Sequence, residues 1–224
     1  MMEKDAELIG VYGMRGSGKS TLTKGLIKSG YEKILAFDTI GEYGGRGWVQ
    51  CKTIKEVVQA MGKRWKSGFK ISFLPTAGAH IEDLHELASM CFKVQQPYRE
   101  NRDHRKLMMV VEEANMSMPN QAFSRKYASM QSVILQGRHW GIEAIGVSQR
   151  PALLSSDFRG NTARTYVFTL ANQNDRVEIA KVIGRQHLPM LNSMQRFEFI
   201  EIENGNFRRG KTSRTGKISY VRTD

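Results

Sequence analysis

The feature that most constrains the fold is a glycine-rich segment close to the start of the sequence. Residues 13–20 read G-M-R-G-S-G-K-S and match the pattern G-x-x-x-x-G-K-[ST] of a phosphate-binding P-loop. The apolar run 8–12 before it is suited to a buried strand, and residues 21–29 after it favour a helix that stops at Gly30. Because strand, glycine loop and helix follow one another as the motif requires, we expect a nucleotide site built on an α/β fold.

The residue types in this loop fit the binding of a triphosphate. Glycines let backbone N–H groups turn toward phosphate oxygens, and the N-terminus of the following helix adds a partial positive charge. Lys19 is expected to reach the β- and γ-phosphates of ATP, and Ser20 to bind Mg²⁺. The alternative is a chance turn rich in glycine and serine, which the flanking strand and helix disfavour. The predicted nucleotide-binding residues are Gly13, Met14, Arg15, Gly16, Ser17, Gly18, Lys19, Ser20 and Thr21.

Length and charge limit the domain count and the class of partner. The chain has 224 residues, 40% of them hydrophobic, which suffices for one packed α/β domain with at most a small appendage. We expect an ATPase domain at 1–203 and a basic tail or hairpin at 204–224. The net charge of +12 favours an anionic partner such as nucleic acid, although a basic surface that serves only solubility would give the same balance.

Cysteine usage and the N-terminus indicate the compartment. Cys51 and Cys91 are the two cysteines and lie far apart, so a disulfide framework is excluded and a structural zinc site is disfavoured. The polar start 1–5 is not a secretory signal, and no apolar stretch has membrane-spanning length. We therefore expect a soluble, cytoplasmic protein that would need a partner to associate with a membrane.

Strand and helix patterns alternate along the chain, which predicts a mostly parallel sheet covered by helices. Turn-forming Asn-Gly, Arg-Gly and Thr-Gly pairs after residue 203 predict short hairpin strands in the tail. The predicted strands are 8–12, 33–37, 69–74, 107–111, 143–147, 164–170 and 197–202, and the predicted helices are 21–29, 53–65, 81–94, 121–136 and 175–183.

Two acids follow the most apolar of these strands. Residues 107–111 read L-M-M-V-V and run directly into Glu112 and Glu113, the pattern of a Walker B strand. A central parallel strand delivers its C-terminal residues to the crevice where ligands bind. By their order we assign Glu112 to the Mg²⁺ shell and Glu113 to the catalytic base that activates water. The alternative is a surface acid pair that caps the next helix near Asn115.

The next strand also ends in polar residues, which read Ser148-Gln149-Arg150-Pro151. Gln149 can hydrogen-bond both an attacking water and a γ-phosphate oxygen, and it carries no charge of its own. Upstream, Arg138 could lie at a subunit surface and reach a neighbour's nucleotide, where an arginine supplied in trans speeds turnover. Arg138 as a solvated cation at a helix end is the alternative, and spacing alone favours it.

Four segments in this order resemble the HerA/FtsK superfamily of P-loop ATPases. They are the P-loop 13–21, the stretch 37–43 with its D-x-x-G-E-Y element, the acid strand 110–115, and the G-R-x-x-G…Q-R-P block from 137 to 151. Together they bracket residues 7 to 185, most of the chain. The P-loop is common to many families, whereas the D-x-x-G-E-Y and Q-R-P elements make the resemblance specific.

The resemblance implies a RecA-like P-loop fold with an additional strand, and a ring ATPase, usually hexameric, that pumps double-stranded DNA. Because the chain is short, it is similar to the compact genome-packaging ATPases of tailless, membrane-containing viruses, whose partners would include capsid or membrane vertex proteins. By position, Gln149 matches the family's sensor glutamine and Arg138 its arginine finger, with Arg150 as the second choice. Family members commonly have Asp where this chain has Glu112, which leaves the division of roles between Glu112 and Glu113 open.

Two basic clusters are candidate DNA contacts, because phosphate binding needs only such cations. For the first cluster a solvated face is the preferred reading, whereas the glycine-punctuated tail favours contact with nucleic acid or a capsid. Lys63, Arg64 and Lys66 form a third candidate. The first cluster comprises Arg99, Arg102, His104, Arg105 and Lys106, and the tail cluster comprises Arg208, Arg209, Lys211, Arg214, Lys217 and Arg222.

Three functions other than genome packaging are compatible with a P-loop. They are conjugation-like DNA transfer, a nucleotide-gated role in virion assembly or extrusion, and a small-molecule kinase. The Glu112–Glu113 strand end and the Gln149-Arg150-Pro151 block fit a hydrolase better than a kinase.

Overall fold

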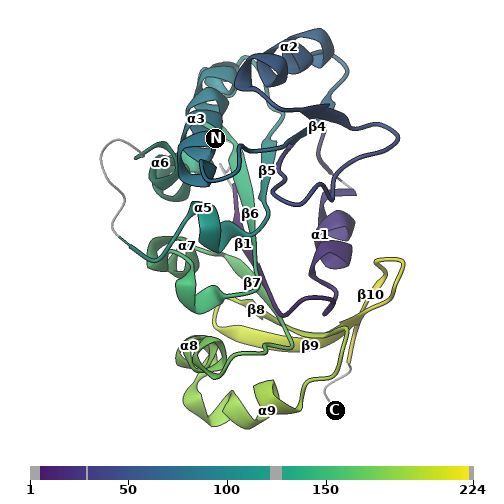
Figure 1. The fold of residues 1–224 in the computed structure, drawn as a ribbon, viewed down its shortest axis with the longest axis vertical. Coiled ribbons are helices and arrows are strands. Elements are labelled where there is room, and N and C mark those ends of the chain that lie inside the picture. The colour runs from purple at the N-terminus through teal and green to yellow at the C-terminus, as the bar shows by residue number, and fades with distance from the viewer. Residues whose placement is uncertain (1–5, 29, 122–127, 222–224) are drawn as a thin grey trace.

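The strands of the computed structural model form one ten-stranded sheet in the order β10-β9-β8-β7-β1-β6-β5-β2-β4-β3 (Figure 1). From β7 to β3 all neighbours are parallel, whereas β8, β9 and β10 are added in antiparallel fashion. The strands are β1 Leu8–Tyr12, β2 Lys33–Phe37, β3 Val49–Cys51, β4 Phe69–Phe73, β5 Leu107–Val111, β6 Ile142–Ser148, β7 Arg164–Phe168, β8 Glu198–Glu203, β9 Asn206–Thr212 and β10 Ile218–Tyr220.

The structure describes residues 6–28, 30–121 and 128–221. The predicted N-terminal segment 1–5, the helix end at Ser29, residues 122–127 of the predicted helix 121–136, and Arg222 of the tail cluster lie outside them. The predicted α/β fold with a mostly parallel sheet is confirmed. The additional strand is β6, which lies between the P-loop strand β1 and the acid strand β5.

Helices cover both faces of the sheet, with α1 on one face and α3 and α6 on the other (Figure 1). Helix α2 begins with a capping box, in which Thr53 accepts a hydrogen bond from the Glu56 N–H and the Glu56 carboxylate accepts one from the Thr53 N–H. The helices are α1 Lys19–Lys28, α2 Ile54–Arg64, α3 His80–Val94, α4 Gln96–Arg99, α5 Ala114–Ser117, α6 Ala128–Gln136, α7 Ser156–Gly160, α8 Gln173–Ile183 and α9 Leu188–Ser193.

The sheet separates two apolar cores. Leu22 and Ile27 of α1 pack against one face together with Val11, and Leu84 and Val133 belong to the larger core on the other face. The central strands β1, β2, β5 and β6 are buried along their whole length, as expected for parallel strands covered on both faces. Their apolar runs therefore fix the positions of the loops that follow them.

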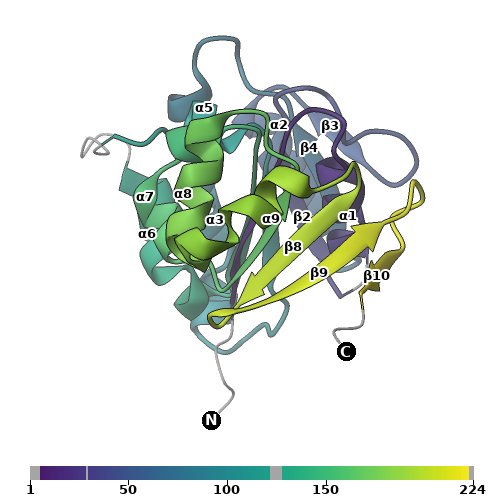
Figure 2. The same cartoon turned by 90° about the horizontal axis from the view of Figure 1, so that it is seen from below.

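The C-terminal strands form a hairpin that lies beside α1 (Figure 2). The turn between β9 and β10 brings Gly216 against Thr21 and Gly25, because a Cβ placed on Gly216 would lie 3.3 Å from the Thr21 carbonyl oxygen. The predicted hairpin character of the tail is thus confirmed. The boundary between a domain at 1–203 and a tail at 204–224 falls at the turn between β8 and β9, and it stays a prediction.

Candidate nucleotide-binding and hydrolysis site

The P-loop leaves β1 at the carboxyl-terminal edge of the sheet and is held there by backbone hydrogen bonds. The N–H of Gly13 donates to the Ser148 carbonyl at 3.1 Å, and the N–H of Met14 donates to the Thr169 carbonyl at 2.8 Å. Gly16 and Gly18 adopt φ values of 74° and 117°, which side chains other than glycine disfavour. The loop therefore bridges the ends of β6 and β7 in a conformation that its glycines permit.

Lys19 is largely buried, with 8% of its surface exposed, and its Nζ donates to the Met14 carbonyl at 3.1 Å. Burial lowers the pKa of its ammonium group, and the charges of Glu113 and Glu112 act in the opposite direction. Among the described residues no carboxylate forms an ion pair with Lys19. A buried cation without a salt bridge, beside a glycine loop, fits an anionic ligand.

Ser17 in the same loop has a buried hydroxyl with no hydrogen-bond partner among the described residues. A buried hydroxyl without a hydrogen bond is uncommon in a native fold, because leaving its hydrogen bond unmade costs about 1–3 kcal/mol. Its place inside the P-loop gives the loop further capacity to bind phosphate oxygens.

Glu112 lies at the end of β5 and is 2% exposed. The Tyr43 hydroxyl donates to its Oε1 at 2.7 Å. Burial raises the pKa of Glu112 to about 7, while the Tyr43 hydrogen bond lowers it. The pKa of Tyr43 is itself raised well above its usual value by burial and by Glu112, so the phenol remains a donor.

The D-x-x-G-E-Y segment has a structural role that the motif did not indicate. The buried Asp38 carboxylate accepts hydrogen bonds from the N–H groups of Glu42 and Tyr43, each at 2.8 Å, and from the Ser72 hydroxyl at 2.8 Å. Asp38 thereby folds the loop after β2 so that Tyr43 points at Glu112. No sequence signal distinguished Tyr43 as the partner of Glu112, because the contact joins two separate loops.

Glu113 and Gln149 come together as the order of the strands predicts. The Gln149 amide Nε2 donates to Glu113 Oε1, across the ends of β5 and β6. Glu113 has a φ of 44°, the left-handed region that costs a non-glycine residue free energy, and it precedes α5. An amide and a carboxylate in contact at this edge can together orient a water molecule.

The two candidate arginines lie at opposite edges of the sheet. Arg150 stays at the carboxyl-terminal edge, where its Nε donates to Asp175 Oδ2 at 2.8 Å. Arg138 is exposed in the 3₁₀ turn Gly137–Trp140 and lines a pocket with Glu7 and Ile142, at the amino-terminal edge. Arg138 is therefore not brought together with the P-loop of its own chain.

Ser20 and Glu112 are the residues that would hold a metal ion. Hydroxyl and carboxylate oxygens are hard ligands of the kind that Mg²⁺ prefers. Ser20 makes no side-chain hydrogen bond with a described residue, and Lys19 next to it interacts electrostatically with Glu112. The donor set thus fits Mg²⁺.

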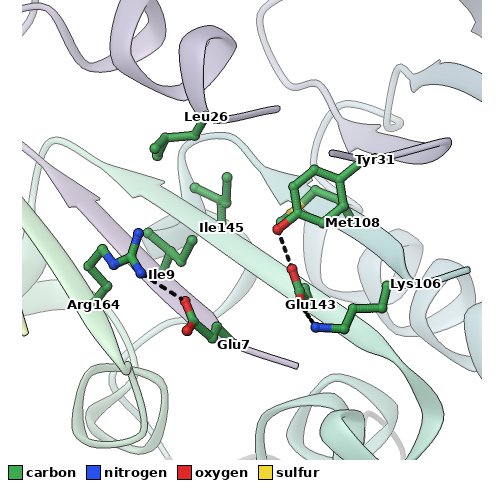
Figure 3. A pocket seen from close by; sticks show the side chains of 9 residues that line it. All are labelled: Glu7, Ile9, Leu26, Tyr31, Lys106, Met108, Glu143, Ile145 and Arg164. Atoms are coloured by element: carbon green, nitrogen blue, oxygen red, sulfur yellow. Dashed lines mark hydrogen bonds and ion pairs between the residues drawn. The ribbon is translucent and has the colours of Figure 1, made fainter. Parts of the chain in front are cut away.

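A pocket of about 350 Å³ opens at the other edge of the sheet (Figure 3). Its polar side chains are paired with one another: Lys106 donates to Glu143 at 2.7 Å, Tyr31 also donates to Glu143, and Arg164 lies 3.5 Å from Glu7. Since these charges are already neutralised, the pocket fits an anion less well than the P-loop does.

The basic clusters are partly neutralised in the same way. In the first cluster Arg102 pairs with Glu100, and Arg105 pairs with Asp103 at 2.8 Å. In the tail, acids of β8 pair with Arg208, Arg209 and Lys211, whereas Arg214 and Lys217 form no ion pair with a described residue. Lys63, Arg64 and Lys66 are exposed.

Two residues that sequence reasoning missed contact the P-loop from the segment before β8. The Arg196 Nε donates to the Gly16 carbonyl at 2.9 Å, and the Phe197 N–H donates to the Ser17 carbonyl at 3.1 Å. Neither residue belongs to a motif, so no sequence pattern could have indicated them.

Known proteins resemble this chain in fold. No family model matches it, and no curated protein sequence is similar to it. The genome-packaging NTPase B204 of Sulfolobus turreted icosahedral virus 2, in complex with AMPPCP, matches with a TM-score of 0.67 and 16% identity over 93% of this chain and 98% of that one. The DNA-packaging ATPase B204 of Sulfolobus turreted icosahedral virus matches with a TM-score of 0.65 and 14% identity, over 98% of both chains.

The monomer form of the pCW3 conjugation coupling protein TcpA is also similar, with a TM-score of 0.56 and 13% identity over 92% of this chain and 60% of that one. In the described residues no helix is long and apolar enough to cross a membrane. The resemblance to viral genome-packaging P-loop ATPases, predicted from the sequence motifs, is thus confirmed by the fold.

Proposed function

We propose that this protein is an ATP-hydrolysing motor that moves double-stranded DNA and packages a viral genome into a capsid. One observation supports this most: Lys19, Glu112, Glu113 and Gln149 gather at one edge of a sheet whose fold is that of viral packaging NTPases. Cation, carboxylates and amide are the groups that phosphoryl transfer to water requires.

Each of these residues has a distinct role in the proposed reaction. Lys19 and the P-loop N–H groups bind the phosphates, and Gln149 positions the attacking water against Glu113, which accepts its proton. Tyr43 holds the Glu112 carboxylate in place. Ser20 and, through water, Glu112 would hold Mg²⁺, which would supply positive charge to the phosphate site.

The position of Arg138 supports a ring, and the expected number of six subunits comes from the resemblance to the HerA/FtsK superfamily. An arginine at the amino-terminal edge serves a nucleotide only if a neighbouring copy presents its P-loop to it. Arg150 is less suited to this role, because Asp175 already binds its guanidinium.

The rim of the nucleotide site supports a subunit interface there. Exposed apolar side chains follow four different strands at the carboxyl-terminal edge, and apolar groups gathered around a polar site favour contact with another protein. These residues are Met14, Ile40, Met116 and Leu153.

For DNA we favour the turn between β9 and β10, since Arg214 and Lys217 are the tail cations without a described ion pair. Contacts to phosphate carry no sequence information, as packaging a whole genome requires. The motor would act in the host cytoplasm or in the virion, docked on capsid or membrane vertex proteins.

The test is ATP hydrolysis and translocation with purified protein and linear double-stranded DNA. We expect DNA-stimulated release of phosphate and displacement of a DNA-bound roadblock. Arg138→Ala should abolish turnover and Arg185→Ala, an exposed arginine of the 3₁₀ turn Arg185–His187, should not. Mixing Arg138→Ala with Glu113→Gln should restore part of the activity if Arg138 acts in trans, and a fully active monomer would contradict the ring.

The fold similarity to a conjugation coupling protein supports DNA transfer between cells as the second candidate. Both candidates predict translocation, and they differ in partner: binding to capsid or vertex proteins supports packaging. Transfer of phosphate to a nucleoside instead of water would indicate a kinase and would contradict both.

A further inference from the structure

The segment between α9 and β8 crosses the P-loop of the same chain. It makes two hydrogen bonds to consecutive loop residues, from Arg196 Nε to the Gly16 carbonyl at 2.9 Å and from the Phe197 N–H to the Ser17 carbonyl at 3.1 Å. The Thr169 hydroxyl after β7 donates to carbonyls of the same segment. We call residues 194–197 the strap.

The strap is held in a strained conformation against the loop. Phe197 has a φ of 69°, a left-handed backbone that costs a non-glycine residue about 1–3 kcal/mol. Its carbonyl accepts a hydrogen bond from the Thr212 N–H of β9 at 3.0 Å, so both of its backbone polar groups are bound. A Cβ on Gly18 would lie 3.1 Å from the Phe197 ring, which shows how closely the ring packs on the loop.

Arg196 keeps most of its bonding capacity free. Its guanidinium lies over the Phe197 ring, 4.9 Å from the ring centroid, and its side chain is exposed. Among the described residues it forms no ion pair, whereas Arg150, Arg159 and Arg164 each bind a carboxylate. A planar guanidinium backed by an aromatic ring offers its other face to a second flat group.

The strand order tells which part of a nucleotide would meet the strap. The groups proposed for hydrolysis follow β5 and β6, on one side of the P-loop strand β1, so the γ-phosphate points to that side. The strap precedes β8, which lies on the other side of β1, beyond β7. With the phosphates in the P-loop, the nucleoside therefore extends from the loop toward the strap.

We propose that Arg196 and Phe197 form the nucleoside contact of the site, with the base stacked on the Arg196 guanidinium and Phe197 supporting it from behind. The proposal rests on the proposed nucleotide-binding function and adds the residues that recognise the end of ATP which the P-loop does not touch. Stacking of this kind tolerates different bases, so the contact adds affinity more than base specificity.

The experiment compares two ligands by calorimetry: a non-hydrolysable ATP analogue, which has a nucleoside, and tripolyphosphate, which does not. Arg196→Ala should weaken binding of the ATP analogue about tenfold, the effect expected for loss of one stacked base, and should leave tripolyphosphate binding unchanged. Arg196→Lys keeps the positive charge but lacks the planar guanidinium, so it should also lose affinity for the ATP analogue and not for tripolyphosphate. Arg185→Ala is the matched control and should bind both ligands as the wild type does.

The outcomes separate the two levels of the proposal. If the wild type binds both ligands, and Arg196→Ala weakens the binding of both equally or of neither, the proposed nucleoside contact is overturned. A wild type that binds neither ligand would instead overturn nucleotide binding itself. Phe197→Leu, with an unchanged melting temperature as the check on folding, should weaken only the ATP analogue, and an equal effect on both ligands would count against the stack.

Discussion

Each edge of the parallel sheet carries a buried lysine, but the two edges use this lysine in opposite ways. At the amino-terminal edge Lys33 is bound to Asp103 at 2.9 Å and to Gln95 at 3.2 Å, and its Nζ lies 4.0 Å from the centre of the Trp65 ring. At the carboxyl-terminal edge Lys19 is also buried, yet a single backbone carbonyl is its hydrogen-bond partner among the described residues.

The difference separates charges that stabilise the fold from charges that await a ligand. A buried ion whose bonds are all made within the chain has little left to offer a ligand, whereas one left underbonded destabilises the empty protein and stabilises the complex. Lys33 and Lys19 therefore predict opposite results in assays of activity and of stability.

The largest expected effect is on hydrolysis. Lys19→Ala removes the cation from the phosphate site and should reduce ATP turnover by at least about a thousandfold, since one group aimed at developing charge contributes about 10²–10³ and substrate binding weakens as well. Lys106→Gln, which alters a paired charge at the other edge, should stay within about twofold of the wild type. Comparable losses in both variants, measured by phosphate release, would erase the distinction between the edges.

A somewhat smaller effect is expected for the proposed base. Glu113→Gln keeps the shape of the side chain and removes its basicity, so turnover should fall by about 10²–10³ while ATP affinity stays near that of the wild type. Because a glutamine at position 113 can still accept the hydrogen bond from Gln149, a loss of turnover in this variant cannot be attributed to a folding defect. Turnover and affinity come from steady-state kinetics and calorimetry, and a loss of affinity with unchanged turnover would assign Glu113 to binding.

Replacing the buried lysine should change the free energy of unfolding differently at the two edges. Lys33→Ala removes the buried cation that Asp103 and the Gln95 Oε1 bind, and it should lower the free energy of unfolding by about 3 kcal/mol. Lys19→Ala should leave the free energy of unfolding without nucleotide unchanged or raise it, because it removes a desolvated charge. Urea unfolding of both variants without nucleotide measures this, and equal destabilisation would mean that Lys19 is structural too.

The smallest effect concerns pH at the paired edge. Hydrogen bonds from Arg105 hold the pKa of Asp103 well below its usual range. Because the folded-state pKa is the lower one, this stabilisation is complete above the unfolded-state pKa of about 3.9 and is lost as pH falls below it. Asp103→Asn should cost about 1–2 kcal/mol at pH 6, and the difference from the wild type should shrink by pH 2.5. A constant difference across this range would rule out titration of Asp103 as the cause.

The sequence predicted what depends on local pattern and missed what depends on distant contacts. The apolar runs of β1, β2 and β5 predicted the bounds of these strands to the residue, while β3 was missed because Val49–Cys51 is only three residues long and contains the polar Gln50. Helix 121–136 is tested only over Ala128–Gln136. The contact between Glu113 and Gln149 was predictable, because parallel strands end at one edge of the sheet. Tyr43 and Arg196 lie in loops, and hydrophobic periodicity does not predict the conformation of loops.

The bond between Arg196 and Gly16 joins residues 180 positions apart, which has a consequence for how the protein is made. At about 5–20 residues per second, the P-loop leaves the ribosome roughly 10–40 s before the strap that covers it. Contacts of such long sequence separation form slowly, because the closure entropy of the chain opposes them until the intervening strands pair. The P-loop therefore gains its contacts with the strap only late in the synthesis of the chain.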